Sequence, residues 1–301
     1  MASLREIRQK SKSVKSTLSV TRAMKMVAAA RLAKAQGRIL SARPFALRMQ
    51  QLLEDIDKQT DIPGSDQQQI HPLLAEFNTN NELIVVVSGD KGLCGAFNSN
   101  VLRKALAYIK GNAGKNISVI AVGKKTRNFF RRLRFPVIKE YVNIFSRMGF
   151  VHAELIGRDV IECYLKEKLA SVKIFYNSLK NAVVQDLKIE QLLPVESKRG
   201  ISEKPVPEQT RNDAGVGFLY EPDCGIILET LLPRYIKAQI YRILMDSYAA
   251  ELGARMTAMD SATKNALELI DILNLQFNKI RQGLITRELS ELVSGAEALS
   301  A

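Results

Sequence analysis

Two stretches of regularly spaced apolar residues, one at each end of the chain, constrain the fold more than any other feature. In the N-terminal stretch, apolar or small residues recur in alternating steps of three and four, with Lys25 as the main interruption. This spacing is typical of the contact seam of a coiled-coil helix. It predicts a helix over residues 1–58 that Pro44 bends or interrupts. The seam consists of Leu4, Ile7, Ser11, Val14, Leu18, Thr21, Lys25, Ala28, Leu32, Ala35, Ile39 and Ala42.

A second seam of the same period predicts a long C-terminal helix within residues 216–301. Neither helix has a partner beside it in the sequence, so we expect the two to pair as an antiparallel coiled coil. The small residues Ala28, Ala35 and Ala42 should then accept larger side chains such as Leu273 and Phe277. The second seam consists of Leu252, Met256, Met259, Thr263, Ala266, Ile270, Leu273, Phe277, Ile280 and Leu284.

The two predicted helices differ in length. They run for about 55 and about 75 residues, or roughly 80 and 110 Å at the helical rise per residue. About 20 residues of the second helix should therefore extend alone past the start of the first. This tip still carries an apolar stripe, which predicts a sleeve formed by another protein rather than a frayed end. The stripe consists of Ile285, Leu289, Leu292, Ala296 and Leu299.

The middle of the chain has a different period. Residues 59–81 are polar, contain two prolines and a glycine, and are interpreted as a linker. Over residues 82–215, short Val- and Ile-rich runs alternate with helical patterns, which predicts a central Rossmann-like α/β domain with a largely parallel sheet. Residues 171–194 are expected to form a hairpin at the sheet edge, and residues 197–215 a mobile loop.

A glycine-rich segment, "SGDKGLCGAFN" at residues 88–98, follows the first predicted strand. Its glycines at 89, 92 and 95 match neither a Walker loop nor the dinucleotide spacing G-x-G-x-x-G. Asn98 or Ser99 should cap the helix that follows. Cys94 lacks a predicted histidine partner, so the sequence offers no convincing nucleophile, and we expect no catalytic, cofactor or metal residues.

The net charge of +13 is unevenly distributed. Residues 1–50 hold twelve Lys/Arg and one acid, Glu6, and so contribute +11. A solvated helix face is the simplest explanation of such a run. A nucleic acid, an anionic lipid surface or an acidic protein surface would each fit as a partner. The chain lacks an apolar run that could act as a secretory signal or membrane span, and its three cysteines are interpreted as free thiols.

Several segments together resemble the gamma subunit, or central stalk, of F-type ATP synthases. The matching stretches are "TRAMKMVAAARLAKAQ", "ARPFA", "SGDKGLCGAFN", "LYEPD", "LLPRYI", "YRILMDSYAAELGARMTAMDSATKNA" and "NKIRQGLITRELSELVSGAEAL". They occur in the family's order over nearly the whole chain. The paired cysteines of the chloroplast regulatory insert have no counterpart here, and the absence of a transit peptide favours a bacterial protein.

The resemblance implies a rotary, non-catalytic subunit that couples proton flow to ATP synthesis or hydrolysis and helps to regulate ATPase activity. Its partners would be the alpha and beta subunits of the catalytic head, the epsilon subunit and the membrane ring of c subunits. The implied location is the cytoplasmic side of the bacterial inner membrane, without a membrane span and without nucleic acid.

The resemblance also assigns contact residues. Beta-subunit contacts would come from Arg8, Lys12, Arg22, Met24, Lys25, Arg31, Lys91, Cys94, Arg281, Gln282, Thr286, Arg287 and Glu288. An apolar bearing would be formed by Ile285, Leu289, Leu292 and Leu299. Contacts with the rotor ring and epsilon would come from Arg38, Tyr220 and Glu221.

Two alternatives come from the residues alone. The basic first fifty residues would suit a coiled-coil nucleic-acid-binding protein, although no RNA- or DNA-binding motif accompanies them. The central domain would suit an α/β nucleotide hydrolase with structural arms. Steep salt-dependent DNA binding would favour the first alternative, and measurable nucleotide affinity the second.

Overall fold

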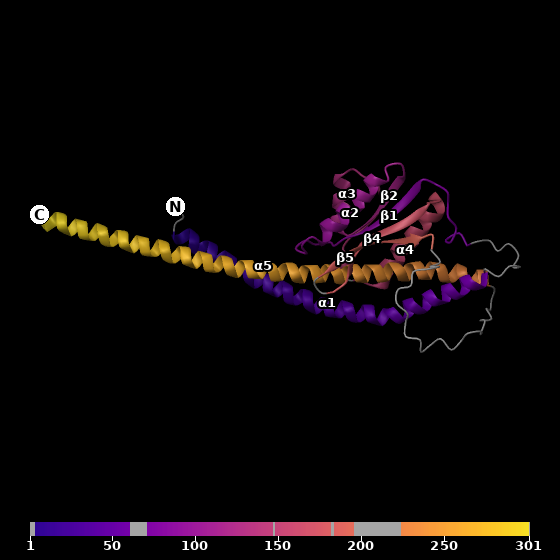
Figure 1. The fold of residues 1–301 in the computed structure, drawn as a ribbon, viewed down its shortest axis with the longest axis horizontal. Coiled ribbons are helices and arrows are strands. Elements are labelled where there is room, and N and C mark those ends of the chain that lie inside the picture. The colour runs from indigo at the N-terminus through magenta and orange to yellow at the C-terminus, as the bar shows by residue number, and fades with distance from the viewer. Residues whose placement is uncertain (1–3, 61–70, 147, 182–183, 196–223, 301) are drawn as a thin grey trace.

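A computed structural model describes residues 4–60, 71–146, 148–181, 184–195 and 224–300. Two very long helices, α1 (Leu4–Thr60) and α5 (Cys224–Ser300), run antiparallel and carry an α/β domain on one side (Figure 1). With 57 and 77 residues, the two helices have the unequal lengths that the seams predict. The predicted loop at 197–215 and the predicted linker residues 61–70 lie outside the described residues.

The seam of α1 is confirmed position by position. Each seam residue from Leu4 to Ile39 is buried or half-buried, whereas most other residues of this segment are exposed. Pro44 neither ends nor interrupts α1, which continues to Thr60. Pro233 likewise lies inside α5.

The register of the coiled coil differs from the expected one. The hydroxyl oxygens of Thr21 and Thr263 are 3.0 Å apart, and Lys25 forms an ion pair with Asp260. Leu32 and Ala35 pack with Ala249 and Leu252, so Leu273 and Phe277 do not fill the positions of Ala28 and Ala35. They lie instead beside Ile7 and Ser11, near the beginning of α1. Size complementarity alone was a poor guide, because a repeating seam can pair in several offsets.

The α/β domain contains one five-stranded sheet with the order β3-β2-β1-β4-β5. Strands β1 (Asn81–Val87), β2 (Asn116–Val122), β3 (Val137–Tyr141) and β4 (Ser171–Leu179) are parallel. The edge strand β5 (Gln185–Leu193) is antiparallel to β4, which confirms the predicted hairpin.

Helices cover both faces of this sheet. On one face, α2 (Phe97–Gly111) and α3 (Lys124–Arg132) pack against Ile84 and Val86 of β1. On the other, α4 (Phe150–Glu167) and α5 pack against Leu83, Val85 and Val87. Residues alternate between the two faces of a strand, and both faces of β1 are buried, which explains its unbroken apolar run from Leu83 to Val87. A short 3-10 helix, η1 (Ile144–Ser146), precedes α4.

Candidate functional site

The free end of α5 extends beyond α1 (Figure 1). From Arg281 to Ala296, every residue of this tip is exposed. Its apolar stripe is therefore open to solvent, with Ile285 48%, Leu289 57% and Leu292 70% exposed. A helix in water gains most of its stability from packing, so an uncovered stripe of this length indicates a surface made for a partner. The side chain of Leu299 lies outside the described residues.

Polar residues of the tip alternate with this stripe. Arg287 Nε donates to Glu291 Oε1 at 2.8 Å, an ion pair one helical turn apart, and the Thr286 hydroxyl donates to the backbone oxygen of Gln282. The side chains of Arg281, Gln282 and Glu288 are exposed. Donors and acceptors are thus available on the tip for a partner's polar groups.

The basic face of α1 is exposed at the predicted contact positions Arg8, Lys12, Arg22 and Arg31. Arg38 is exposed as well, and Met24 is half-buried. Lys25 differs from the other cations because its ammonium group pairs with Asp260 of α5, while 44% of its side chain remains exposed. Tyr220 and Glu221 lie outside the described residues.

An open groove of about 740 Å³ lies between the helices where α1 begins. Its apolar floor includes Leu273 and Phe277 of α5. Four cations of α1 line its sides, namely Arg5, Arg8, Lys12 and Lys15. The groove therefore combines an apolar floor with a positive rim, the pattern that suits an acidic partner with apolar side chains.

A second basic surface was not predicted from the sequence. Residues 91–139 contain twelve Lys/Arg and no acid, and most of these cations lie on or beside α2 and α3. These two helices cover the sheet face that points away from the coiled coil (Figure 1). In the described part of the chain, ion pairs hold only Lys115, Arg131 and Lys139 among these cations. We call this surface the outer basic face; its exposed residues include Arg103, Lys104, Lys110, Lys125, Arg132 and Arg134.

The glycine-rich segment, residues 88–97, lies at the carboxyl end of β1, where open α/β sheets hold their ligands. In this structure α5 occupies that end of the sheet: the β4 backbone nitrogen of Leu179 donates to Asp246 of α5 at 3.1 Å. A Cβ built on Gly89 would lie 2.9 Å from the carboxyl carbon of Glu251 of α5. The crevice is therefore filled by this chain's own helix, which leaves a nucleotide little room.

The expected cap of α2 was wrong. Neither Asn98 nor Ser99 caps this helix, which begins at Phe97; Asn98 instead accepts the Gly89 N–H at 2.8 Å and donates to the Lys91 carbonyl. Cys94 is only 1% exposed and packs with Phe97, Ala250 and Ala254. Burial also raises the pKa of Cys94. Lys91 remains exposed.

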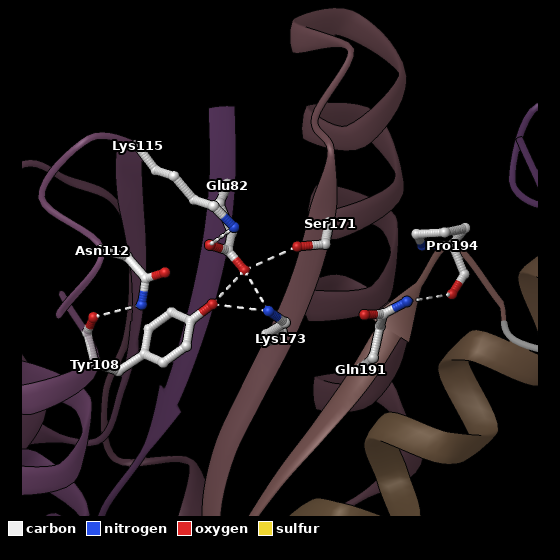
Figure 2. A network of polar contacts seen from close by, with 8 residues as sticks. All are labelled: Glu82, Tyr108, Asn112, Lys115, Ser171, Lys173, Gln191 and Pro194. Atoms are coloured by element: carbon white, nitrogen blue, oxygen red, sulfur yellow. Dashed lines mark hydrogen bonds and ion pairs between the residues drawn. The ribbon is translucent and has the colours of Figure 1, made fainter. Parts of the chain in front are cut away.

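A buried carboxylate at the opposite end of the sheet is the centre of a cluster of polar contacts (Figure 2). Glu82 is fully buried and accepts hydrogen bonds from Tyr108, Ser171 and Lys173 at 2.7–2.8 Å. Burial opposes its ionisation, but these hydrogen bonds and the Lys173 charge outweigh that effect and lower its pKa to about 2. A carboxylate this well satisfied is not poised for proton transfer near neutrality. The cluster therefore joins β1, β4 and α2 structurally.

Comparison with known proteins decides the family. The family model described as ATP synthase matches residues 3–299. A gamma chain of ATP synthase from Anaeromyxobacter dehalogenans is 41% identical, with the match covering 99% of this chain and 100% of that one. The gamma chain from Geotalea uraniireducens is 40% identical over 99% of both chains. The chain belongs to the ATP synthase gamma-chain family.

Solved structures agree in fold. A chain from the central stalk and c-ring of Tetrahymena thermophila mitochondrial ATP synthase matches with a TM-score of 0.57 and 25% identity, over 81% of this chain and 99% of that one. A chain of the Euglena gracilis mitochondrial enzyme matches with a TM-score of 0.66 and 19% identity, over 98% and 94%. The second likeness concerns the fold alone. These relatives give no support to the nucleic-acid alternative.

The family makes this chain a subunit of an enzyme complex that associates with a membrane. None of the described helices is both long enough and apolar enough to cross a bilayer.

Proposed function

We propose that the chain is the rotating central stalk of a bacterial ATP synthase and couples proton flow through the membrane ring to catalysis in the alpha/beta head. The observation that carries the proposal is the bare tip of α5, residues 281–296, with its uncovered apolar stripe. A shaft end must be enclosed without being fixed, and apolar contacts suit this because they are non-directional. Catalysis takes place in the partner subunits, and this chain has no active site of its own.

The tip has two roles in this proposal. Arg281, Gln282, Thr286, Arg287 and Glu288 form directional bonds to beta-subunit loops that hold the stalk in one orientation. Ile285, Leu289, Leu292 and Leu299 slide in an apolar sleeve of the head.

The basic surfaces face acidic surfaces of the head. On α1 these contacts come from Arg8, Lys12, Arg22 and Arg31. Met24 lies between them, and Lys25 contributes a cation that also forms an ion pair with Asp260. The open groove beside Arg8 and the exposed Lys91 support the same assignment. The outer basic face extends the positive surface beyond the coiled coil, onto the side of the α/β domain nearest the tip (Figure 1). Opposite charges speed docking and penalise wrong orientations.

We assign the contacts with the membrane ring of c subunits and with the epsilon subunit to Arg38, Tyr220 and Glu221. In this proposal the chain lies on the cytoplasmic side of the inner membrane, where epsilon and this stalk together restrain ATPase activity.

Assembly and turnover of a truncation series test the proposal. The chain is co-expressed with the alpha and beta subunits of its host, either complete, shortened by four residues or ended at Leu284. The four-residue trim should preserve assembly and ATPase activity, because a sleeve contact is spread over many weak contacts. Ending at Leu284 should weaken both. An Arg281→Ala/Gln282→Ala variant should lose activity while retaining the helix content of the coiled coil.

The opposite pattern would overturn the proposal. If the complete chain fails to co-purify with alpha and beta, or if ending at Leu284 changes nothing, the tip is not enclosed by the head. Tight, steeply salt-dependent DNA binding by the purified chain would instead favour a nucleic-acid function.

A further inference from the structure

The glycine-rich segment lies along two turns of α5. Cys94 and Phe97 pack against Ala250 and Ala254. A Cβ built on Gly95, whose φ of +56° favours glycine, would lie 3.9 Å from the Cβ of Ala258. Glycines at 89, 92 and 95 thus follow the α5 surface from Glu251 to Ala258, which explains a spacing that fits no phosphate-binding loop. We call residues 88–97 the glycine clasp.

Glu251 and Arg255 are the polar centre of this contact. Arg255 donates to Glu251 Oε1 at 2.8 Å and to the Gly92 carbonyl at 3.2 Å. Their side chains are only 5% and 13% exposed. The other oxygen, Glu251 Oε2, is buried and has no hydrogen-bond partner among the described residues. The missing side chain of Gly89 is what lets the Glu251 carboxylate approach the loop.

The rest of the interface between α5 and the α/β domain combines apolar packing with a few polar contacts. Lys237 pairs with Glu154 of α4, Arg242 pairs with Glu190 of β5, and the Leu179 N–H donates to Asp246. Both of these ion pairs are more exposed to water than the Glu251–Arg255 pair. Leu232, Ile236, Ile240 and Leu244 are buried in the domain core. Such apolar contact resists separation but is non-directional. A charged side chain bonded to a backbone carbonyl has a fixed direction and distance, so it resists sliding and turning.

We propose that Glu251 and Arg255, held by the glycine clasp, are the buried positioning residues that, together with the more exposed polar contacts of α5, fix the α/β domain at one angle about the α5 axis. Their role in passing torque between the domain and the shaft rests on the proposed function. Their role in closing the clasp does not depend on it, so the two can be tested separately.

The charge of Glu251 gives the clasp a pH signature. Burial raises the pKa of Glu251, Asp90 of the clasp adds to the effect, and Arg255 and Lys91 oppose it. Opening would expose the carboxyl to water and return its pKa towards the ordinary value of 4.5. The proton therefore stabilises the closed clasp. This contribution is complete below about pH 4.5 and is lost as the pH rises through the raised pKa.

Hydrogen exchange of residues 88–97 in the isolated full chain tests the closure. Glu251→Ala should increase clasp opening on the order of tenfold, the usual effect of losing a charge-assisted hydrogen bond. Gly89→Ala should also open the clasp, because the added methyl group would collide with the Glu251 carboxylate. Glu251→Gln keeps the shape and the bond from Arg255, so the clasp should stay closed and lose its pH dependence. Glu268→Ala, an exposed acid on the same helix, is the matched control and should change nothing.

A disulfide provides a rescue. The distance between the positions Gly95 and Ala258 is within the Cβ–Cβ range of a disulfide. The reference is Gly95→Cys/Ala258→Cys with Glu251 retained and the three native cysteines replaced by alanine, because it carries both the strain of a side chain at the positive φ of position 95 and the loss of the Cys94 thiol. Adding Glu251→Ala to this reference should open the clasp when the disulfide is reduced and leave it protected when the disulfide is oxidised. If Glu251→Ala leaves the clasp protected, or if Glu251→Gln opens it as much as alanine does, the assignment is wrong.

The assembled complex tests the torque role. Glu251→Ala should retain ATPase activity while ATP-driven proton pumping falls severalfold, and the oxidised disulfide should restore pumping. Normal pumping in Glu251→Ala would overturn the torque role. Failure of the wild-type chain to assemble would instead count against the proposed function and leave the exchange result standing.

Discussion

The buried carboxylate of Glu82 offers a quantitative prediction about the stability of the α/β domain. The change is Glu82→Gln, which preserves shape and one acceptor oxygen but removes the charge. Tyr108, Ser171 and Lys173 donate to this carboxylate at 2.7–2.8 Å, and Lys115 forms a further ion pair with it at 3.4 Å (Figure 2). Lys173 would still donate a hydrogen bond to the Tyr108 hydroxyl at 2.7 Å, so the cluster would lose some of its polar contacts but not all of them.

The magnitude follows from the pKa of Glu82, which falls from 4.5 to about 2. A pKa difference of this size corresponds to about 3 kcal/mol of folding free energy. Because the folded pKa is the lower one, this stability is present above pH 4.5 and is lost as the pH falls towards 2. Glutamine keeps part of the hydrogen bonding, so we expect a loss of about 2–3 kcal/mol at pH 7.

Urea unfolding at pH 7 and pH 3, followed by circular dichroism and tyrosine fluorescence, measures the effect. The variant and the wild-type chain should differ most at pH 7 and converge towards pH 3. Glu162→Gln, which removes an exposed pair with Lys166, is the matched control and should change stability little. Two results would show that the Glu82 charge does not supply this stability. One is a Glu82→Gln variant as stable as the wild-type chain at pH 7. The other is a variant whose unfolding free energy falls between pH 7 and pH 3 by as much as that of the wild-type chain.

Three further predictions concern the coiled coil and the basic surfaces. Leu252→Ala, at a seam position only 2% exposed, should lower the unfolding free energy by about 2–5 kcal/mol in urea titrations. Met24→Lys should impair coupling with assembly intact, because an added ion pair of about 1–3 kcal/mol must break in each turn; ATP-driven proton pumping measures this. Lys125→Glu/Arg132→Glu on the outer basic face should slow association with the alpha/beta head and reduce its salt dependence, as stopped-flow mixing would show.

The pairing of the two terminal helices was predictable because an apolar period of three and four has few other solutions. The register was not, because a repeating seam fits its partner at several offsets. Single polar contacts select the offset, and Lys25, which interrupts the seam, does so through Asp260. The one charged residue in the apolar seam of α1 thus carries the information about the register.

The glycine clasp shows a different limit. The glycine spacing matches none of the known phosphate-binding loops, but the surface that the glycines follow comes from residues about 160 positions later in the chain. Local patterns do not contain such a contact. The outer basic face was within reach of the sequence, since residues 91–139 lack any acid. The total of +13 concealed it, because acids elsewhere in the chain offset these cations.

Direct observation of rotation tests the central claim. A probe is attached to the α/β domain through Val151→Cys, an exposed position on α4 outside the outer basic face, in a background with the three native cysteines replaced by alanine. The alpha/beta head is fixed to a surface by its beta subunits, and ATP is added. We expect the probe to rotate continuously in one direction and to stop when ATP is withdrawn. A complex that hydrolyses ATP at its full rate while the probe stays still would contradict it.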